Sequence, residues 1–155
     1  GYDTKYLAKK VGEEGFVYSF DIQDVAIKST KKMLDKENLT HRVKLILDGH
    51  ENMDKYVDKE VSCVLFNLGY LPTGDKSITT NYESTINAIN NALKILDIKG
   101  VIIIVVYVGH ESGKIEDEKL NEYIKTLNQK QYDVVSYRFL NQINNPPYCI
   151  VIERK

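Results

Sequence analysis

Apolar and polar positions along the chain form blocks that predict strands and helices in alternation. Short β-branched and aromatic runs predict strands, and apolar residues at helical spacing predict the helices between them. We expect strands at 16–20, 43–47, 61–66, 101–107, 132–139 and 148–153. We expect helices at 3–10 and 24–34, from a capping box at Thr80 to Gly100, and around Leu120 to Leu127. This order predicts an α/β fold with a mainly parallel sheet covered on both faces.

Individual strands add detail to this fold. The run 101–107 is the most hydrophobic, so we place it in the sheet interior, and the apolar run 61–66 reads as a fully buried strand. The polar, proline-containing link between 132–139 and 148–153 is too short for a crossover helix. We therefore expect the last two strands to be antiparallel, in one domain that spans 1–155.

Composition and charge narrow the class of protein. The 155 residues carry a net charge of -1, which argues against the strongly basic surface of many nucleic-acid binders but leaves a local basic patch open. No apolar run approaches a membrane span and no leader opens the chain, so we expect a cytoplasmic protein. Cys63 and Cys149 lie in apolar runs and are expected to be buried small hydrophobes, rather than a disulfide or nucleophiles. No zinc-ligand spacing is present, so no metal is expected.

Polar residues follow three of the predicted strands directly. They are Asp21, then Asp48 with Gly49 and His50, and Asn67 ahead of a turn rich in Gly and Pro. Ligands bind at this edge of α/β sheets, where a carboxylate can hold a ribose and a carboxylate or backbone amide can meet an adenine edge. Either aspartate could instead be a helix N-cap. Together they favour an adenosine-type ligand.

The beginning of the chain resembles the end of a glycine-rich turn. Gly1-Tyr2-Asp3-Thr4 leads straight into the first predicted helix, with no strand ahead of it. Without a central first strand, a doubly wound sheet would have two unpaired interior edges. We therefore expect native residues upstream of this numbering, which contain an apolar first strand and the earlier glycines of the turn.

Several motifs together carry a resemblance to a known family. They are Gly1-x-Asp3-Thr4, Phe20-Asp21-Ile22-Gln23, Asp48-Gly49-His50-Glu51, the block from Asn67 to Thr80, Gly109-His110 and Asn144-Asn145-Pro146-Pro147. The chain resembles, over essentially its whole length, the class I S-adenosylmethionine-dependent methyltransferases called putative rRNA methylases, whose members act on tRNA. The resemblance implies a Rossmann-like fold and N-methylation of 5-aminomethyl-2-thiouridine at the tRNA wobble position.

The resemblance also implies which residues hold S-adenosylmethionine. The methionine end would meet Gly1, Asp3 and Thr4. Asp21, with Gln23 beside it, would hold the ribose hydroxyls, and Asn67 and Leu68 would border the sulfonium. The adenine would be flanked by Asp48, Gly49 and His50.

The expected chemistry is the alignment of an amine with an activated methyl group. A primary alkylamine titrates near ~10, so a proton must leave before transfer, either to Asp75, to His110 or to bulk water. Asn67 is expected to align the reactants, and Tyr70 to stack on the uracil ring. Each of Tyr70, Asp75 and His110 could instead have only a structural role in its loop.

Substrate contacts are expected around the same edge of the sheet. Asn145-Pro146-Pro147-Tyr148 matches a motif of exocyclic-amine methyltransferases but lies between the last two strands, so Asn67-Leu68-Gly69-Tyr70 is the better analogue. The loop with Asn144 and Asn145 is expected to border the substrate entrance or to be a plain turn.

The expected partner is the tRNA anticodon stem-loop. Dispersed lysines such as Lys76 and Lys114 would contact it, and a homodimer could widen the basic surface. The alternatives are methylation of rRNA or of a small-molecule amine, a non-catalytic cofactor-binding module, and, with least support, an oxidoreductase.

Overall fold

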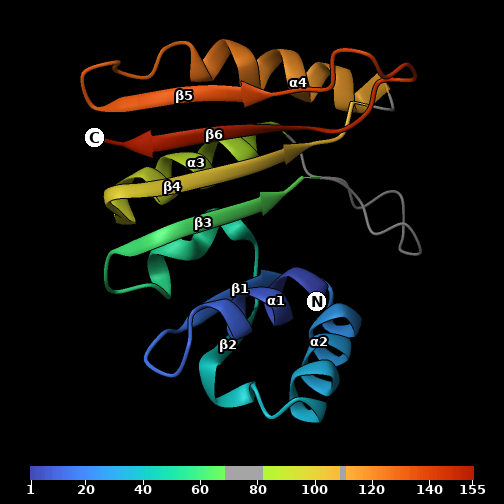
Figure 1. Ribbon diagram of the computed structural model, residues 1–155, viewed down its shortest axis with the longest axis vertical. Helices are drawn as coiled ribbons and strands as arrows, with labels where there is room; N and C mark the ends of the chain where they lie inside the picture. The colour runs from blue at the N-terminus through green and yellow to red at the C-terminus, as the bar shows by residue number, and fades with distance from the viewer. Residues whose placement is uncertain (69–81, 109–110) are drawn as a thin grey trace. The chain divides into compact units, whose positions relative to one another are not determined.

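The computed structural model describes residues 1–68, 82–108 and 111–155, without the side chains of 111–114 and 116 (Figure 1). It divides the chain into two compact units, Gly1–Val57 and Asp58–Lys155, and each is described by itself below. The expectation of a single domain over 1–155 stays a prediction.

The N-terminal unit is a two-stranded parallel sheet with helices packed on it. Its elements are α1 (Tyr2–Lys10), β1 (Val17–Asp21), α2 (Asp24–Lys36), η1 (Thr40–Arg42), β2 (Val43–Leu47) and η2 (His50–Lys55). The register runs from Val17 beside Val43 to Asp21 beside Leu47. The two strands therefore end together at one edge.

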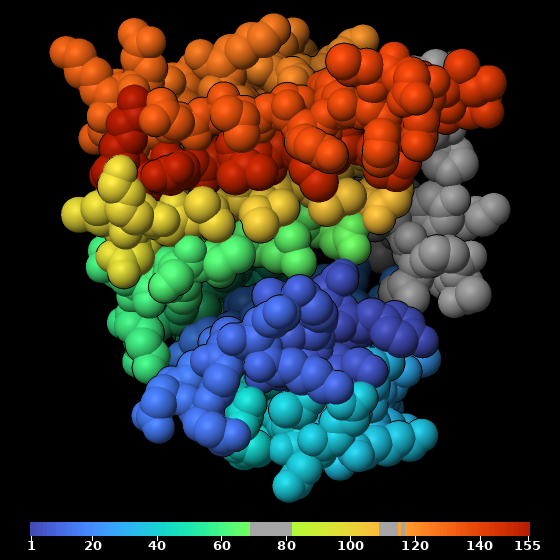
Figure 2. Space-filling view, in the orientation of Figure 1, coloured from blue at the N-terminus to red at the C-terminus, as the bar shows by residue number. Residues whose placement is uncertain are grey.

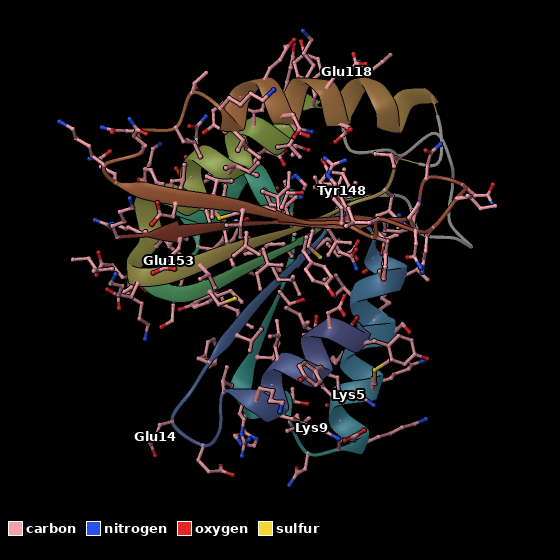
Figure 3. The ribbon with its side chains drawn as sticks, turned by 45° about the horizontal axis from the view of Figure 1, so that its top comes forward. Lys5, Lys9, Glu14, Glu118, Tyr148 and Glu153 are labelled. Carbon is pink, nitrogen blue, oxygen red and sulfur yellow. The ribbon has the colours of Figure 1, made fainter. Side chains whose placement is uncertain are left out.

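A small apolar core holds this unit together. Its buried members come from both helices, both strands and the link after α2, and they are Ala8, Val17, Leu34, Leu39 and Val43. At the surface, Lys5 and Lys9 of α1 both pair with Glu37, the residue at the end of α2 (Figure 3). Helical spacing in the sequence predicts that Ala26, Ile27, Thr30, Met33 and Leu34 share the inward face of α2, and all five are buried or half-buried, so that prediction is confirmed.

The C-terminal unit is a four-stranded sheet. Its elements are β3 (Val61–Asn67), α3 (Tyr82–Ile95), β4 (Leu96–Val106), α4 (Glu111–Ile124), β5 (Tyr132–Tyr137) and β6 (Tyr148–Arg154). The strand order is β3-β4-β6-β5, with β3 and β4 parallel and β6 antiparallel to both of its neighbours (Figure 1). The interior position of the most hydrophobic strand and the antiparallel last strand are both confirmed.

Helices α3 and α4 lie on one side of this sheet (Figure 3). The side chains between sheet and helices are almost completely buried, and they include Ile102, Ile104, Ile150, Ile152 and Leu120. On β3, by contrast, Phe66 is the one buried residue. The expectation that this strand is fully buried is wrong, because β3 is the end strand of its sheet and pairs with β4 alone among the described residues.

The two cysteines also differ from expectation. Cys63 is exposed and Cys149 is half-buried, and both are free thiols. Cys63 lies three positions before the buried Phe66, and Cys149 lies one position before the buried Ile150. Strand residues an odd number of positions apart point to opposite faces, so both cysteines face the side of the sheet opposite α3 and α4. The prediction that both are buried hydrophobes is therefore wrong.

The third helix ends earlier than its sequence suggests. Helix α3 stops at Ile95, and Leu96 already pairs with Val61 in the sheet. The register then shifts before Cys63 pairs with Val101, and Lys99 in this irregular stretch has a φ of 66°. Gly100 is thus part of a bulged strand rather than the end of the helix. Thr80 of the expected capping box lies outside the described residues.

Strands and helices alternate in both units, so the α/β fold class with a mainly parallel sheet is confirmed. Among the described residues, β1 pairs with β2 alone, and the upstream first strand stays a prediction. No helix of the described residues is long and apolar enough to cross a membrane.

Candidate functional site

The N-terminal unit places two carboxylates where its parallel strands end. Asp21 is the last residue of β1 and lies in register with Leu47, the last residue of β2. Asp48 follows Leu47 directly, so Asp21 and Asp48 leave neighbouring strands at the same edge. This edge is the usual ligand position in a parallel α/β sheet.

Asp21 keeps one carboxylate oxygen for a ligand. Its Oδ1 accepts a hydrogen bond from the backbone N–H of Gln23 at 2.9 Å. Gln23 is the N-cap residue of α2, so the alternative that Asp21 is the N-cap is wrong. The side chain of Asp21 is half-buried, and its Oδ2 forms no hydrogen bond or ion pair within the described residues. This oxygen can accept from a ligand hydroxyl.

Asp48 instead organises its own loop. Its Oδ1 accepts from the backbone N–H of Gly49 at 2.7 Å and from Asn52 Nδ2 at 2.9 Å, and its Oδ2 accepts from the Tyr56 hydroxyl at 2.7 Å. These bonds, with that from Tyr56 the strongest cause, lower the pKa of Asp48. The same contact raises the pKa of Tyr56. Both carboxylate oxygens therefore already have protein partners within the loop. Gly49 is the N-cap residue of η2, so the alternative that Asp48 is the N-cap is wrong as well.

Gly49 and His50 complete this turn. A Cβ at Gly49 would overlap the carboxylate of Glu51, so glycine lets that carboxylate approach the backbone. His50 begins η2, and burial lowers its pKa although Glu51 opposes the shift. The lowered pKa of His50 favours a neutral imidazole at pH 7.

The start of α1 packs closely on its neighbours. Gly1 is the N-cap residue of α1, and a Cβ there would overlap Oγ1 of the buried Thr30 in α2. The hydroxyls of Thr4 and Ser19 lie 2.8 Å apart, which joins α1 to β1. Asp3 is exposed in the first turn of α1. The three residues expected at the methionine end therefore lie together at the beginning of this helix.

In the C-terminal unit, Asn67 ends β3 with its side chain exposed. The backbone N–H of Leu68 still donates to the carbonyl oxygen of Val105 at 3.1 Å, and the Leu68 side chain is only 3% exposed. Pairing with β4 thus continues one residue beyond Asn67. It fixes the backbone on both sides of the Asn67 side chain at the carboxyl end of the strand.

The loop between β5 and β6 leaves the sheet at the same edge of this unit. Because β4 and β5 are both antiparallel to β6, β5 runs parallel to β3 and β4. Asn144 and Asn145 in this loop are exposed, with φ angles of 69° and 49°, a left-handed conformation that asparagine tolerates. Figure 2 shows the loop at the surface of its unit, in orange-red. Its expected position beside the carboxyl edge is confirmed, and its substrate role stays a prediction.

Tyr148, the first residue of β6, anchors the end of this loop to α4. It is 4% exposed and lies between the sheet and the helix (Figure 3). Its hydroxyl donates to Asp117 Oδ1 and accepts from Asn121 Nδ2, the latter at 3.0 Å. Burial and the Asp117 carboxylate raise the pKa of Tyr148 to about 12. The tyrosine of the Asn-Pro-Pro-Tyr sequence is therefore a buried anchor here.

Some expected site residues lie outside the described residues, namely Tyr70, Asp75, Lys76 and His110. The side chain of Lys114 is not described either. Within the described residues, no group of three His, Cys, Asp or Glu side chains could hold a metal ion.

Sequence reasoning missed the partners that fix this site. Tyr56 and Asn52 support Asp48, and Asp117 and Asn121 support Tyr148. The Asp117 and Tyr148 positions are 31 residues apart in sequence, so no local spacing indicates their contact. The contact between Asp117 and Asn121 did have a sequence signal, because residues four positions apart lie next to each other on a helix.

Comparison with known proteins decides the family. The model of the family described as "Putative rRNA methylase" matches residues 17–153. The chain belongs to this family. The resemblance noted from the sequence motifs is thereby confirmed.

Relatives of this rRNA methylase family member include a named tRNA enzyme. The Arabidopsis thaliana protein "tRNA (mnm(5)s(2)U34)-methyltransferase, chloroplastic" is 35% identical over 165 residues. The alignment covers 100% of this chain and 60% of the plant protein, so the chain spans less than two thirds of that relative.

Solved structures show the same relationship. A putative rRNA methylase from Clostridium thermocellum is 50% identical with a TM-score of 0.97, and a putative methyltransferase from Streptococcus mutans in complex with SAH is 38% identical with a TM-score of 0.89. Each match covers 100% of this chain and 83% of the other. A putative O-methyltransferase from Klebsiella pneumoniae, 9% identical with a TM-score of 0.77 and covering 100% of this chain and 69% of its own, shares the fold. The Rossmann-like methyltransferase fold is thereby confirmed.

Proposed function

We propose that this protein is an S-adenosylmethionine-dependent methyltransferase that converts 5-aminomethyl-2-thiouridine at the tRNA wobble position to 5-methylaminomethyl-2-thiouridine. The observation that carries the proposal is the 35% identity to a tRNA methyltransferase named for that nucleoside, over the whole of this chain. The family description and a 33% identical rRNA methylase structure from Streptococcus thermophilus favour rRNA as a second candidate substrate.

The described residues fit an adenosine cofactor at the edge of β1 and β2. S-adenosylmethionine, when bound, supplies an activated methyl group. Asp21 Oδ2 accepts from the ribose hydroxyls while Oδ1 stays on Gln23, as its hydrogen-bond pattern allows. Since both oxygens of Asp48 are already bonded within the loop, one of them to the Gly49 N–H, Asp48 acts by holding Gly49 and His50 in place beside the adenine.

The remaining residues position the amine and its proton. The side chain of Asn67 projects from the end of β3 and aligns the aminomethyl nitrogen, and Asn67 and Leu68 border the sulfonium. Positioning of this kind can supply several kcal/mol of barrier lowering without covalent catalysis. Tyr70 stacks on the uracil, and the proton that the amine loses passes to Asp75, to His110 or to bulk water.

The proposed partner is the anticodon stem-loop, bound by Lys76, Lys114, Asn144 and Asn145. A net charge of -1 predicts modest affinity that falls with salt. A homodimer and a cytoplasmic location both stay predictions.

Methyl transfer from labelled S-adenosylmethionine to separate pools tests the proposal. The pools are tRNA that carries 5-aminomethyl-2-thiouridine, the same tRNA as an unmodified transcript, rRNA, and a panel of small amines. We expect label in the first pool alone. Label in rRNA alone would establish the second candidate, and cofactor binding without transfer to any pool would indicate a binding module.

A further inference from the structure

Arg138, the residue after β5, has an unusual position for an exposed arginine. Its guanidinium lies over the ring of Tyr148, with 3.5 Å between Cζ and the ring centroid. Its Nε donates to Ser136 Oγ at 3.0 Å. Arg138 forms no ion pair with any carboxylate of the described residues. The N–H groups on its two terminal nitrogens therefore have no carboxylate partner among the described residues and can donate to a ligand.

The surface beneath Arg138 is rigid. The Tyr148 ring is buried, and its hydroxyl bonds to Asp117 and Asn121 of α4. A guanidinium stacked on a fixed ring and held through Nε has fewer conformations to lose when it binds a ligand. The structure thus presents a planar, permanently charged group in a prepared orientation.

The register of the sheet relates Arg138 to the proposed methylation site. Asn67 pairs with Val105, Val105 with Cys149, and Cys149 with Tyr137, so one row crosses all four strands. Three interstrand spacings of ~4.8 Å give about 14 Å between the Asn67 and Tyr137 backbones. Arg138 follows Tyr137 at the same carboxyl edge. This separation suits neighbouring nucleotides of one RNA strand.

The neighbours of Arg138 favour RNA over other ligands. Tyr137 and Phe139 are 72% and 50% exposed, with ring centroids 6.5 Å apart. Along the chain these two residues alternate with Ser136 and Arg138, so their rings lie on the other face of the strand at the same end of β5. Exposed aromatic rings are typical of surfaces that stack unpaired bases, and the two terminal nitrogens of Arg138 match the oxygens of a phosphate. An apolar protein partner would explain the rings but not the free cation.

We propose that Arg138 binds a backbone phosphate of the single-stranded loop that carries the methylated nucleotide, while Tyr137 and Phe139, on the other face of the same strand end, contact unpaired bases of that loop. The inference rests on the proposed function, because it identifies the RNA contacts of the same site. Tyr148 is a positioning residue that acts through Arg138.

Fluorescence anisotropy with a labelled, unmodified anticodon stem-loop tests the contact in the whole natural chain. Loss of one charged hydrogen-bonding group predicts about tenfold weaker binding for R138Q. The slope of log affinity against log salt, between about 50 and 200 mM, should become shallower by about 0.7 to 0.9. R138K keeps the charge but not the planar fork, so we expect an unchanged slope with intermediate affinity.

Lys130 provides a matched control. K130Q removes the same charge just before β5, and the six residues of β5, about 20 Å of strand, lie between it and Arg138. We expect K130Q to bind RNA with the wild-type salt slope. Thermal melting checks that R138Q is folded, and its exposed position predicts a melting temperature near that of wild type.

The outcomes separate this inference from the proposed function. Wild-type affinity and salt slope in R138Q would overturn the phosphate contact, as would an effect on self-association in place of RNA binding. If R138Q weakens RNA binding but wild type transfers no methyl to 5-aminomethyl-2-thiouridine, the contact stands and the proposed function fails. A wild-type protein that binds no RNA would overturn both.

Discussion

Replacement of Asp21 by asparagine should separate cofactor binding from folding. The amide oxygen of D21N can still accept from the backbone N–H of Gln23, a bond of 2.9 Å in this structure. The start of α2 should therefore be unchanged, and the melting temperature should stay within about 2 °C of wild type. What D21N loses is the negative charge on Oδ2, which is the oxygen proposed to receive the ribose hydroxyls.

The size of the effect follows from the hydrogen bonds involved. A hydrogen bond to a charged group contributes about 1.5–3 kcal/mol, against about 0.5–1.5 kcal/mol for a neutral pair. With two ribose hydroxyls, the loss of charge should weaken binding by about 2–3 kcal/mol, or about 30- to 150-fold. Titration calorimetry with S-adenosylhomocysteine measures this directly.

Asp24 offers a matched control for this substitution. It lies three positions further on, in the first turn of α2, where its exposed side chain pairs with Lys28. We expect D24N to bind S-adenosylhomocysteine as wild type does. Equal affinities for wild type, D21N and D24N would refute the role assigned to Asp21.

Three further predictions concern the other anchors of the site. Y148F removes the hydroxyl bond to Asp117 and should lower the melting temperature by about 3–6 °C, from a loss of about 1.5 kcal/mol in a chain of 155 residues. Because the pKa of Tyr148 is raised to about 12, wild type should also lose stability as pH rises from about 10 through 12. Y148F should lack this loss, and identical alkaline melting curves for the two proteins would contradict the prediction. Y56F removes the main cause of the lowered pKa of Asp48, so the Asp48 carboxyl should titrate at higher pH in carbon NMR. The stability that the charged Asp48 contributes is present above its ordinary pKa, and on acidification Y56F should lose it at a higher pH than wild type does. An unmoved titration would show that Tyr56 does not control it. N67A should lower kcat for methyl transfer about 100-fold with a much smaller change in cofactor affinity, and equal losses in both would contradict a role in alignment.

Much of the fold follows from the sequence because hydrophobic spacing reflects which face of an element is buried. The parallel pairs, the interior β4 and the antiparallel β6 were all predictable in this way. Burial of β3 was not, since an apolar run does not reveal whether strands flank it on both sides. The early end of α3 was missed because helical spacing around Leu96 also fits the start of a bulged strand.

The candidate site was predictable where it depends on strand ends. A polar residue directly after an apolar strand must lie at the sheet edge, which located Asp21, Asp48 and Asn67. Its supporting contacts were not predictable. The bonds of Tyr56 to Asp48 and of Tyr148 to Asp117 depend on how loops and helices return to the sheet, and sequence spacing does not encode that.

Nucleoside mass analysis of tRNA bearing 5-aminomethyl-2-thiouridine tests the central claim most directly. The tRNA is incubated with S-adenosylmethionine and either wild type or N67A. We expect wild type to add one methyl mass to that nucleoside and to no other, and N67A to do so far more slowly. An unchanged nucleoside with the wild-type enzyme, under conditions in which S-adenosylhomocysteine binds, would contradict the claim.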